Sequence, residues 1–331
     1  MPSVSIIVPC YNEQSTVRLL LDSLYTQTYP RNDLEVILAD GMSTDLTRQE
    51  ISLFQSEHPD LAVVVVDNPQ RTIPAGLNRA IQLAQGEYIV RLDAHSQPYP
   101  DYVARCIHDL QQGLGDNVGG VWEIKPGRAG WLAEAIALAA SHPLGVGDAY
   151  YRLSGKAGSV DTVPFGSYRR SLFDQVGLYN PSLLTNEDYE LNTRIRQAGG
   201  LVWLNPAIRS VYYARSTLPA LARQYWRYGF WKARMLRDYP KTIRWRQLLP
   251  PSFVLCLVIL ALLSFWFQAA LWMLTAAVGI YSLALLVVGA HTAIRHQKFL
   301  LILGMPLAIA VMHFCWGSAF LWSWISNIGR S

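Results

Sequence analysis

Cysteine is scarce in this chain of 331 residues, which has only Cys10, Cys106, Cys256 and Cys315. These four lie far apart and show neither the paired spacing of a zinc site nor a disulfide framework. A secretory signal peptide is also missing from the start, because the apolar run at residues 4–8 is short and no basic segment precedes it. Both absences favour a soluble part that faces a reducing compartment such as the cytosol.

Acidic residues are missing from the C-terminal part of the chain, where no Asp or Glu follows Asp238. Three apolar runs occupy this region, at residues 250–267, 269–290 and 299–325, and each is close to or longer than the ~20 residues that cross a bilayer. Without carboxylates the region has little with which to relay protons or transport cations. We therefore interpret it as a membrane anchor that can also guide a lipid.

The arrangement of the apolar runs predicts how they cross the membrane. The first two runs join near Gln268 and would form a tight hairpin, while Pro250 and Pro251 leave open whether the first run spans fully or is re-entrant. Basic residues precede the first run, at Lys241, Arg244 and Arg246, and lie between the second and third runs, at Arg295 and Lys298. Such residues stay cytoplasmic. The pattern predicts a multi-pass protein of the inner (plasma) membrane, with the soluble part and the 291–298 loop in the cytoplasm and the C-terminus outside.

A basic and aromatic stretch precedes the apolar runs. Between Arg215 and Arg246 there are nine Lys or Arg and one acid, with five aromatic residues interleaved from Tyr225 to Trp231. Helices of this composition lie on membrane surfaces and attract anionic headgroups or diphosphates. Nucleic-acid binding is the rival interpretation, but the adjacent apolar runs favour a membrane and no nucleic acid. We expect interfacial helices at residues 215–248, between a soluble domain at 1–214 and a membrane domain at 249–331.

Strand and helix patterns alternate in the N-terminal part. Short apolar runs predict strands, and apolar residues at helical spacing predict helices between them. This alternation indicates an α/β fold with a mostly parallel sheet covered on both faces. The strands are expected at residues 4–8, 34–39, 61–66, 88–92 and 119–123, the helices at 13–28, 46–55, 73–84, 102–114, 131–140 and from about 187, and a loop at 142–161.

Glycine is absent from the turn after the first strand, where a dinucleotide-binding fold needs it. The turn runs from Pro9 to Glu13 and makes a nicotinamide or flavin enzyme unlikely. Carboxylates end two strands instead, with Asp40 after the second and Asp93 after the fourth. The carboxyl ends of parallel strands meet at the ligand-binding edge, where a carboxylate can bind a base, a ribose or a metal. For the 40–45 segment a turn with a helix cap is the alternative, which fits Asp45 better than Asp40.

Asp93 and His95 lie two residues apart just beyond a strand end. Residues at this spacing point the same way, so a carboxylate and an imidazole can face one point. Such a pair suits a divalent cation, which usually serves a phosphorylated substrate. The alternative is that Asp93 caps the next turn and that His95 is an ordinary loop residue.

Glu187 and Asp188 start a predicted helix. Thr185-x-x-Asp188 matches a capping box, and acids are favoured at helix starts. The local pattern thus favours a helix cap. The alternative is that a carboxylate on a rigid helix start acts as a general base, and a side chain in one rotamer serves only one of these roles well. Gly166 has two similar interpretations, either close approach of the backbone to a ligand or a simple turn.

Taken together, the motifs in residues 3–240 resemble the inverting family 2 glycosyltransferases of the GT-A fold. The motifs occur in the family's order, and the Asp-Ala-His motif with the membrane hairpin is most similar to bacterial exopolysaccharide glycosyltransferases of the succinoglycan type, which extend a lipid-linked sugar. His95 stands in place of the family's second Asp, and Tyr228 in place of its Trp. The matching segments are residues 4–13, 40–45, 78–80 with 86–93, 93–95, 186–188 and 224–228.

The resemblance implies metal-dependent, inverting transfer of a sugar from a nucleotide sugar, expected to be UDP-linked, to a membrane-associated, lipid-linked acceptor. Asp93 and His95 would hold Mg or Mn, and Asp188, with Glu187, would supply the base. The resemblance also assigns nucleotide binding to Pro9, Tyr11, Glu13, Asp40 and Asp93, and phosphate or acceptor contacts to Gln224, Arg227 and Gly166.

Two other functions stay open at this point. One is a non-catalytic membrane scaffold that keeps the fold, against which the full set of Asp93, Asp188 and the 224–227 motif argues. The other is a nucleotidyltransferase, which shares the sheet but normally begins with a glycine-rich, basic loop that residues 9–13 do not provide.

Overall fold

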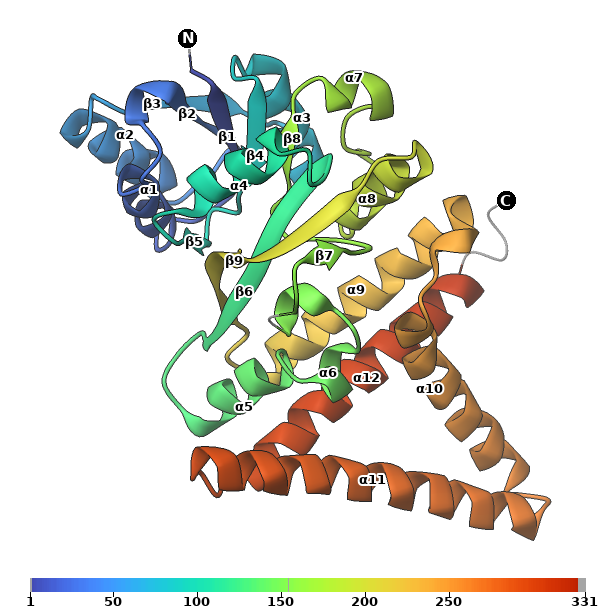
Figure 1. Ribbon diagram of the computed structural model, residues 1–331. Helices are drawn as coiled ribbons and strands as arrows, with labels where there is room; N and C mark the ends of the chain where they lie inside the picture. The colour runs from blue at the N-terminus through green and yellow to red at the C-terminus, as the bar shows by residue number, and fades with distance from the viewer. Residues whose placement is uncertain (1, 154, 327–331) are drawn as a thin grey trace. The chain divides into compact units, whose positions relative to one another are not determined.

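The computed structural model describes residues 2–153 and 155–326 (Figure 1). The chain divides into two compact units. The first comprises the residues up to Glu123 together with Tyr150–Tyr212, and the second comprises Ile124–Ala149 together with the residues from Tyr213 onward. Residues 124–149, assigned above to the soluble domain, thus belong with the basic stretch and the apolar helices.

The first unit is built on a parallel sheet whose central strands run in the order β3-β2-β1-β4. The helices connecting these strands put all four carboxyl ends at one edge, which confirms the predicted α/β architecture. The strands are β1 Val4–Cys10, β2 Leu34–Asp40, β3 Ala62–Asp67 and β4 Tyr88–Arg91, and the connecting helices are α1 Val17–Tyr25, α2 Thr47–Glu57 and α3 Ile73–Leu83, with a 3-10 turn η1 at Arg31–Asp33.

Antiparallel strands extend the sheet beyond β4, in the order β8-β6-β9-β5, with β7 paired to β9. The long strand β9 has no counterpart among the predicted elements, although Val202 and Leu204 show the two-residue spacing of buried strand positions. Pro206 interrupts that spacing within the strand. These strands are β5 Gln97–Pro98, β6 Asn117–Pro126, β7 Gly158–Ser159, β8 Ser167–Arg169 and β9 Val202–Ala214.

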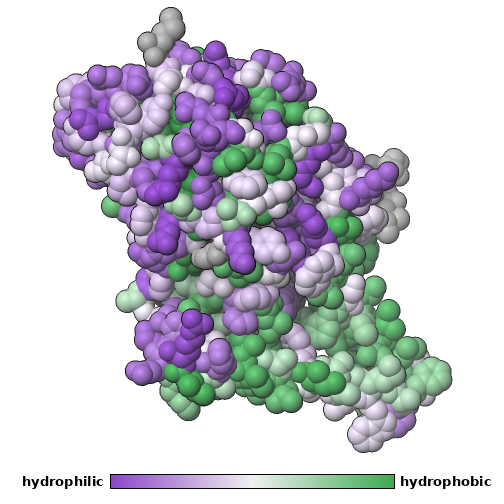
Figure 2. Space-filling view, viewed as in Figure 1, coloured by the Kyte–Doolittle hydropathy of each residue, from purple (hydrophilic) through white to green (hydrophobic). Residues whose placement is uncertain are grey.

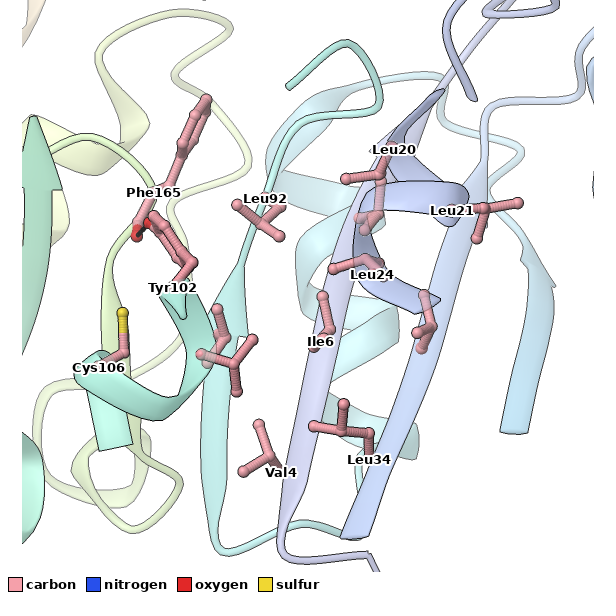
Figure 3. Packing of buried hydrophobic residues seen from close by; sticks show 14 of the residues in the cluster. Val4, Ile6, Leu20, Leu21, Leu24, Leu34, Leu92, Tyr102, Cys106 and Phe165 are labelled. Carbon is pink, nitrogen blue, oxygen red and sulfur yellow. Dashed lines mark hydrogen bonds between the residues drawn. The ribbon is translucent and has the colours of Figure 1, made fainter. Parts of the chain in front are cut away.

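Each face of the sheet carries its own core. Val4, Ile6 and Val8 of β1 join one core with α1, α2 and α4 (Tyr102–Gln111), whereas Ile7 joins the other with α3, α7 and α8. Figure 3 shows Leu20 and Leu24 of α1 packed beside Ile6, and Figure 1 shows α1 and α2 on the opposite side of the sheet from α3, α7 and α8. The two cores fix the strand ends that carry the site; α7 is Leu172–Val176 and α8 is Glu187–Gln197.

The second unit is a set of helices around α12. α5, α9, α10 and α11 all pack against α12, and glycine permits two of these contacts. A Cβ on Gly229 of α9 would lie 2.3 Å from the Trp316 carbonyl oxygen, and one on Gly317 would lie 2.5 Å from that of Pro250. These helices are α5 Trp131–Ala139, α9 Leu218–Asp238, α10 Trp245–Leu263, α11 Gln268–His296 and α12 Leu301–Ile325.

Helices α10, α11 and α12 have 19, 29 and 25 residues and are each long and apolar enough to cross a membrane. This confirms three candidate spans near the predicted positions. Figure 2 shows apolar residues gathered over α10 and α11, where Ile280 is 70% exposed. Large exposed apolar surfaces of this kind are covered by lipid or by a partner in a stable protein.

Two predicted loops are wrong in part. Residues 142–161 contain the short helix α6 Pro143–Val146, the 3-10 turn η2 Tyr150–Arg152 and β7. The 291–298 loop is mostly helical, because α11 continues to His296, where basic side chains favour a helix C-terminus. Gln297 then ends α11 in a left-handed conformation with φ 56°.

The start of the first apolar run also differs from the prediction. α10 begins at Trp245, follows the 3-10 turn η3 (Pro240–Thr242), and contains both Pro250 and Pro251. The expected interfacial segment therefore contains one long helix, α9, followed by η3 and the first turn of α10.

Candidate active site

The predicted acidic residues of the first unit lie at one edge of the sheet. They follow the carboxyl ends of β1, β2 and β4 or stand at the start of α8. Asp40 ends β2, Asp93 follows β4, and Glu187 and Asp188 open α8. Glu13 follows β1 and lies 3.2 Å from His95, measured from Oε1 to Nδ1.

Arg91, the last residue of β4, joins three of these carboxylates. Its Nη2 lies 2.8 Å from Asp93 Oδ1 and 3.3 Å from Glu187 Oε1, and its Nη1 donates to Asp188 Oδ2. Arg91 is only 3% exposed. Burial lowers the pKa of Arg91, but the carboxylates of Asp188, Asp93 and Glu187 outweigh it and raise that pKa well above its ordinary value. The guanidinium therefore stays charged at the centre of the cluster.

The start of α8 directs Asp188 toward this cluster. Asn186 is the N-cap, in a left-handed conformation with φ 69°, and no side chain caps the helix. Thr185 Oγ1 instead donates to the carbonyl of Leu184 at 2.7 Å. The N-cap position thus falls on Asn186 and not on Thr185, and the Asp188 side chain contacts Arg91.

The environment of Asp188 suits a group that accepts a proton near neutrality. Burial raises the pKa of Asp188 to about 7, Arg91 opposes this rise, and the carboxylates of Glu187 and Asp93 add to it. Although 22% of the side chain is exposed, Oδ1 is buried and has no hydrogen-bond partner among the described residues. That oxygen can receive a proton, while Oδ2 stays paired to Arg91.

The pair of Asp93 and His95 has a donor set that suits a divalent cation. If His95 Nδ1 carries the proton and donates it to Glu13, Nε2 is the ring nitrogen that can coordinate a metal, as in the carboxylate–histidine arrangement of many metal sites. Glu13 is itself held by Thr16, whose hydroxyl lies 2.5 Å from Oε2. No group of three or more His, Cys, Asp or Glu is arranged to hold a metal among residues 2–153 and 155–326. A cation here would thus take further ligands from a substrate or water.

Asp40 is fully buried and its carboxylate is already engaged. Its oxygens accept from the Ser43 hydroxyl at 2.5 Å and the Ser43 amide at 3.1 Å, and Arg48 Nε lies 2.5 Å from Oδ2. Arg48 also pairs with Asp67 at the end of β3. For Asp40 to reach a base, Arg48 or Ser43 must therefore move.

The first two strand-end loops are tied together beside Asp40. The backbone N–H of Asn12 donates to Ser43 Oγ at 2.9 Å, and the side-chain Oδ1 of Asn12 accepts from the backbone N–H of Thr44 at 2.8 Å. The Tyr11 ring lies against Gly41, is 44% exposed, and has the Arg71 guanidinium 5.9 Å from its centroid. An exposed aromatic ring with a cation beside it offers a flat surface to a nucleobase.

Two side chains packed around the turn, those of Tyr168 and Asn117, account for Gly166. A Cβ at this position would lie 2.1 Å from Tyr168 Oη and 2.5 Å from Asn117 Oδ1. The Gly166 carbonyl accepts the Arg91 amide at 3.0 Å, which links the turn to β4. Packing alone therefore requires glycine here.

The remaining motif residues lie on helices α3 and α9. Asn78 forms two hydrogen bonds with the backbone of Tyr179, at 2.8 and 2.9 Å, and so secures α3 to the segment before α8. Gln224 and Arg227 lie on α9 in the second unit, where Gln224 Nε2 is 3.0 Å from Tyr228 Oη.

Three arginines at this edge, Arg48, Arg71 and Arg91, are missing from the predicted site. Of these three, only Arg91 could have been predicted from the sequence. An arginine inside an otherwise apolar buried strand requires a buried carboxylate as its counter-charge. Arg48 and Arg71 follow strand ends in polar segments, and nothing in the sequence distinguishes them from ordinary surface residues.

Comparison with known sequences points to one family. The model of "Glycosyl transferase family 2" matches residues 5–177. The chain is 32% identical to succinoglycan biosynthesis protein ExoA of Rhizobium meliloti over 323 residues, which cover 95% of this chain and 93% of that protein. It is 27% identical over 322 residues to a dolichyl N-acetyl-alpha-D-glucosaminyl phosphate glycosyltransferase of Methanococcus voltae, again covering 95% of this chain and 94% of the relative.

Solved structures share the fold. The mannosyltransferase PcManGT of Pyrobaculum calidifontis, in complex with GDP-Man and Mn2+, superposes with a TM-score of 0.63 at 21% identity, covering 97% of this chain and 87% of its own. S. aureus TarS residues 1–349 with UDP give a TM-score of 0.51 at 15% identity, covering 100% and 93%. At these identities the likeness establishes the fold alone.

Proposed function

Because the chain belongs to glycosyltransferase family 2, we propose that it transfers a sugar from a nucleoside diphosphate donor to a lipid-linked acceptor, with inversion at the anomeric carbon. The observation that carries this proposal is the cluster of Asp93, Glu187 and Asp188 around buried Arg91 at the carboxyl edge of the sheet. Ligands of α/β sheets bind at such edges.

Asp188 acts as the general base in the proposed reaction. Its Oδ1, which no described residue hydrogen-bonds, takes the proton of an acceptor hydroxyl, whose oxygen forms a bond to the anomeric carbon. The bond between that carbon and the diphosphate oxygen breaks on the opposite face, and its electron pair leaves with the nucleoside diphosphate. One displacement of this kind inverts the anomeric configuration.

Asp93 and His95 would hold a divalent cation, Mg or Mn, when the donor is bound. Such a cation would supply the positive charge that offsets the negative charge of the leaving diphosphate. The hydrogen bond between His95 and Glu13 supports this role, because it fixes the orientation of the imidazole.

The nucleotide lies along the ends of β1 and β2. Tyr11 and Arg71 provide the surface for the base, proposed to be uracil, and Asp40 contacts it after Arg48 shifts. Pro9 and Glu13 shape the same loop. We retain for Arg227 a contact to phosphate and for Gln224 a contact to the acceptor, as the family resemblance implies.

The acceptor is proposed to be lipid-linked and the protein to be multi-pass. The three apolar helices support this, as do relatives named for succinoglycan biosynthesis and for a dolichyl phosphate substrate. Basic residues at both ends of the α10–α11 hairpin favour a cytoplasmic catalytic part in the inner membrane.

The reaction should depend on pH through Asp188. The base must be ionised, so kcat/KM is expected to rise with pH along a single-proton limb and then level off. The midpoint of this rise in kcat/KM should lie at pH 7 or lower. Asp188 has a pKa of about 7, and a cation beside Asp93 would lower that pKa by offsetting nearby negative charge. Initial rates measured from pH 5 to 9 at constant ionic strength check this. A flat profile across that range would contradict the role of Asp188.

Sugar transfer itself is tested by incubating the purified full chain with membrane lipid and a panel of labelled UDP- and GDP-sugars. We expect label to move to the lipid fraction with one donor. No transfer from any donor would favour the scaffold, and formation of a nucleotide sugar from nucleoside triphosphate and sugar phosphate would favour a nucleotidyltransferase.

A further inference from the structure

Arg91 has no assigned part in the proposed reaction, although it is the most connected residue of the site. It is 3% exposed, and its guanidinium reaches a carboxylate on β4's extension and two on α8. Asp93 belongs to the donor side of the proposed reaction, whereas Asp188 belongs to the acceptor side. The Arg91 guanidinium, a single planar group, therefore links the carboxylate on the donor side to the carboxylate on the acceptor side.

We propose that Arg91 is a positioning residue, which fixes the base Asp188 relative to the donor-side carboxylate Asp93. This inference rests on the proposed function. Arg91 acts through its neighbours and does not itself need to touch substrate.

The hydrogen-bond pattern supports positioning. Arg91 engages Asp188 through Oδ2, whereas Oδ1 is buried and has no hydrogen-bond partner within residues 2–153 and 155–326, so the ion pair sets its direction. Asp93 and Glu187 share the other terminal nitrogen, Nη2. A guanidinium can bridge several carboxylates in a fixed plane, whereas a lysine ammonium is a point charge on a flexible stem.

Charge balance also requires Arg91 at this place. When all three carboxylates are ionised, they and the one guanidinium give a net charge of −2 (−3 + 1) in a largely buried cluster. Without Arg91 the carboxylates repel one another and turn toward solvent. Asp188 and Asp93 then no longer keep fixed positions relative to each other.

In a competing explanation, Arg91 serves only as a counter-charge: it pairs with the Asp93 carboxylate until a metal cation binds there and displaces it. The two explanations predict opposite signs for donor binding. If Arg91 positions Asp93, its removal weakens binding of Mn2+ with UDP; if it merely competes with the cation, its removal strengthens that binding. Calorimetric titration of the full-length protein with MnCl2 and UDP decides between them.

The kinetic test uses Arg91→Lys and Arg91→Gly in the full-length protein. We expect each to lower kcat at least about 100-fold, the cost of a misplaced catalytic group. Added guanidinium, far below denaturing concentrations, should restore kcat of Arg91→Gly about tenfold, as one charge-assisted hydrogen bond provides. It should not restore Asp188→Asn, which lacks the base itself.

Arg194→Lys is the matched control. Arg194 pairs with Glu190 on the same helix and holds the carbonyls of residues 176–178, and it has no contact to the cluster among the described residues. It should lower thermal stability and leave kcat within about threefold of the parent.

Three results would overturn the proposal: kcat of Arg91→Lys within threefold of the parent, tighter Mn2+–UDP binding in either variant, or no guanidinium rescue of a folded Arg91→Gly. Should Arg91→Gly not fold, Arg91→Lys carries the same kinetic and binding tests. The proposed function fails separately, through full activity of Asp188→Asn.

Discussion

Asp188→Asn is expected to lower sugar transfer by about 10³-fold or more while the affinity for UDP and Mn2+ changes little. The amide cannot accept the proton of the acceptor hydroxyl, and general bases contribute about 10²–10⁴ in rate. The change leaves Asp93, His95 and the first-strand loop untouched. Single-turnover transfer from a labelled donor, together with calorimetric UDP binding, measures both quantities.

Stability separates the catalytic role of Asp188 from a structural one. The pKa of Asp188 is raised in the folded protein, so the ionised carboxylate costs stability as the pH rises from the ordinary value of 3.8 through about 7. At pH 8, Asp188→Asn should therefore unfold at a temperature no lower than the parent. Asp174→Asn, on an exposed position of α7, is the control and should be fully active. Loss of both UDP binding and thermal stability in Asp188→Asn would show a structural role.

Chelation of divalent cations is expected to abolish transfer, and Mn2+ or Mg2+ should restore it. Without the cation, no charge compensates the departing diphosphate beside Asp93, and such compensation contributes several kcal/mol to the transition state. Rates measured after dialysis against a chelator, and then after titration with each metal chloride, test this. Undiminished turnover in the chelator would remove the role given to His95.

The contact between Glu13 and His95 allows the affinity for the metal to be lowered without removing a metal ligand. Glu13→Gln weakens the group that orients His95 and should raise the metal concentration for half-maximal activity about 10- to 100-fold. Asp101→Asn is the control, because its carboxylate is exposed and pairs with Arg105 on α4. Equal metal requirements for the two variants would show that His95 does not bind the cation.

Regular periodicity made most of the fold predictable. Val17, Leu20, Leu21 and Leu24 recur at helical spacing and are all 0% exposed on α1. Buried parallel strands read as short apolar runs, so β1, β2 and β4 were found within two residues of their ends. The strand ends then placed Asp40 and Asp93 at the edge of the sheet, because parallel topology leaves no other place for them.

Long-range pairing was not predictable from local pattern. Arg91 and Asp188 are 97 residues apart, and only the packing of α8 on the sheet brings them together. Asp40 was placed correctly at its strand end, but its engagement by Arg48 depends on the side-chain geometry of the following loop. The strand β9 escaped detection because Pro206 interrupts its alternation.

The most direct test of the account is a crystal structure of the Asp188→Asn protein with Mn2+ and its nucleotide sugar, using anomalous scattering to locate the metal. The account predicts manganese within about 2.5 Å of an Asp93 oxygen, His95 bound to the same ion, and the anomeric carbon facing residue 188. Manganese and nucleotide bound away from Asp93, with Arg91 as the only partner of that carboxylate, would contradict it.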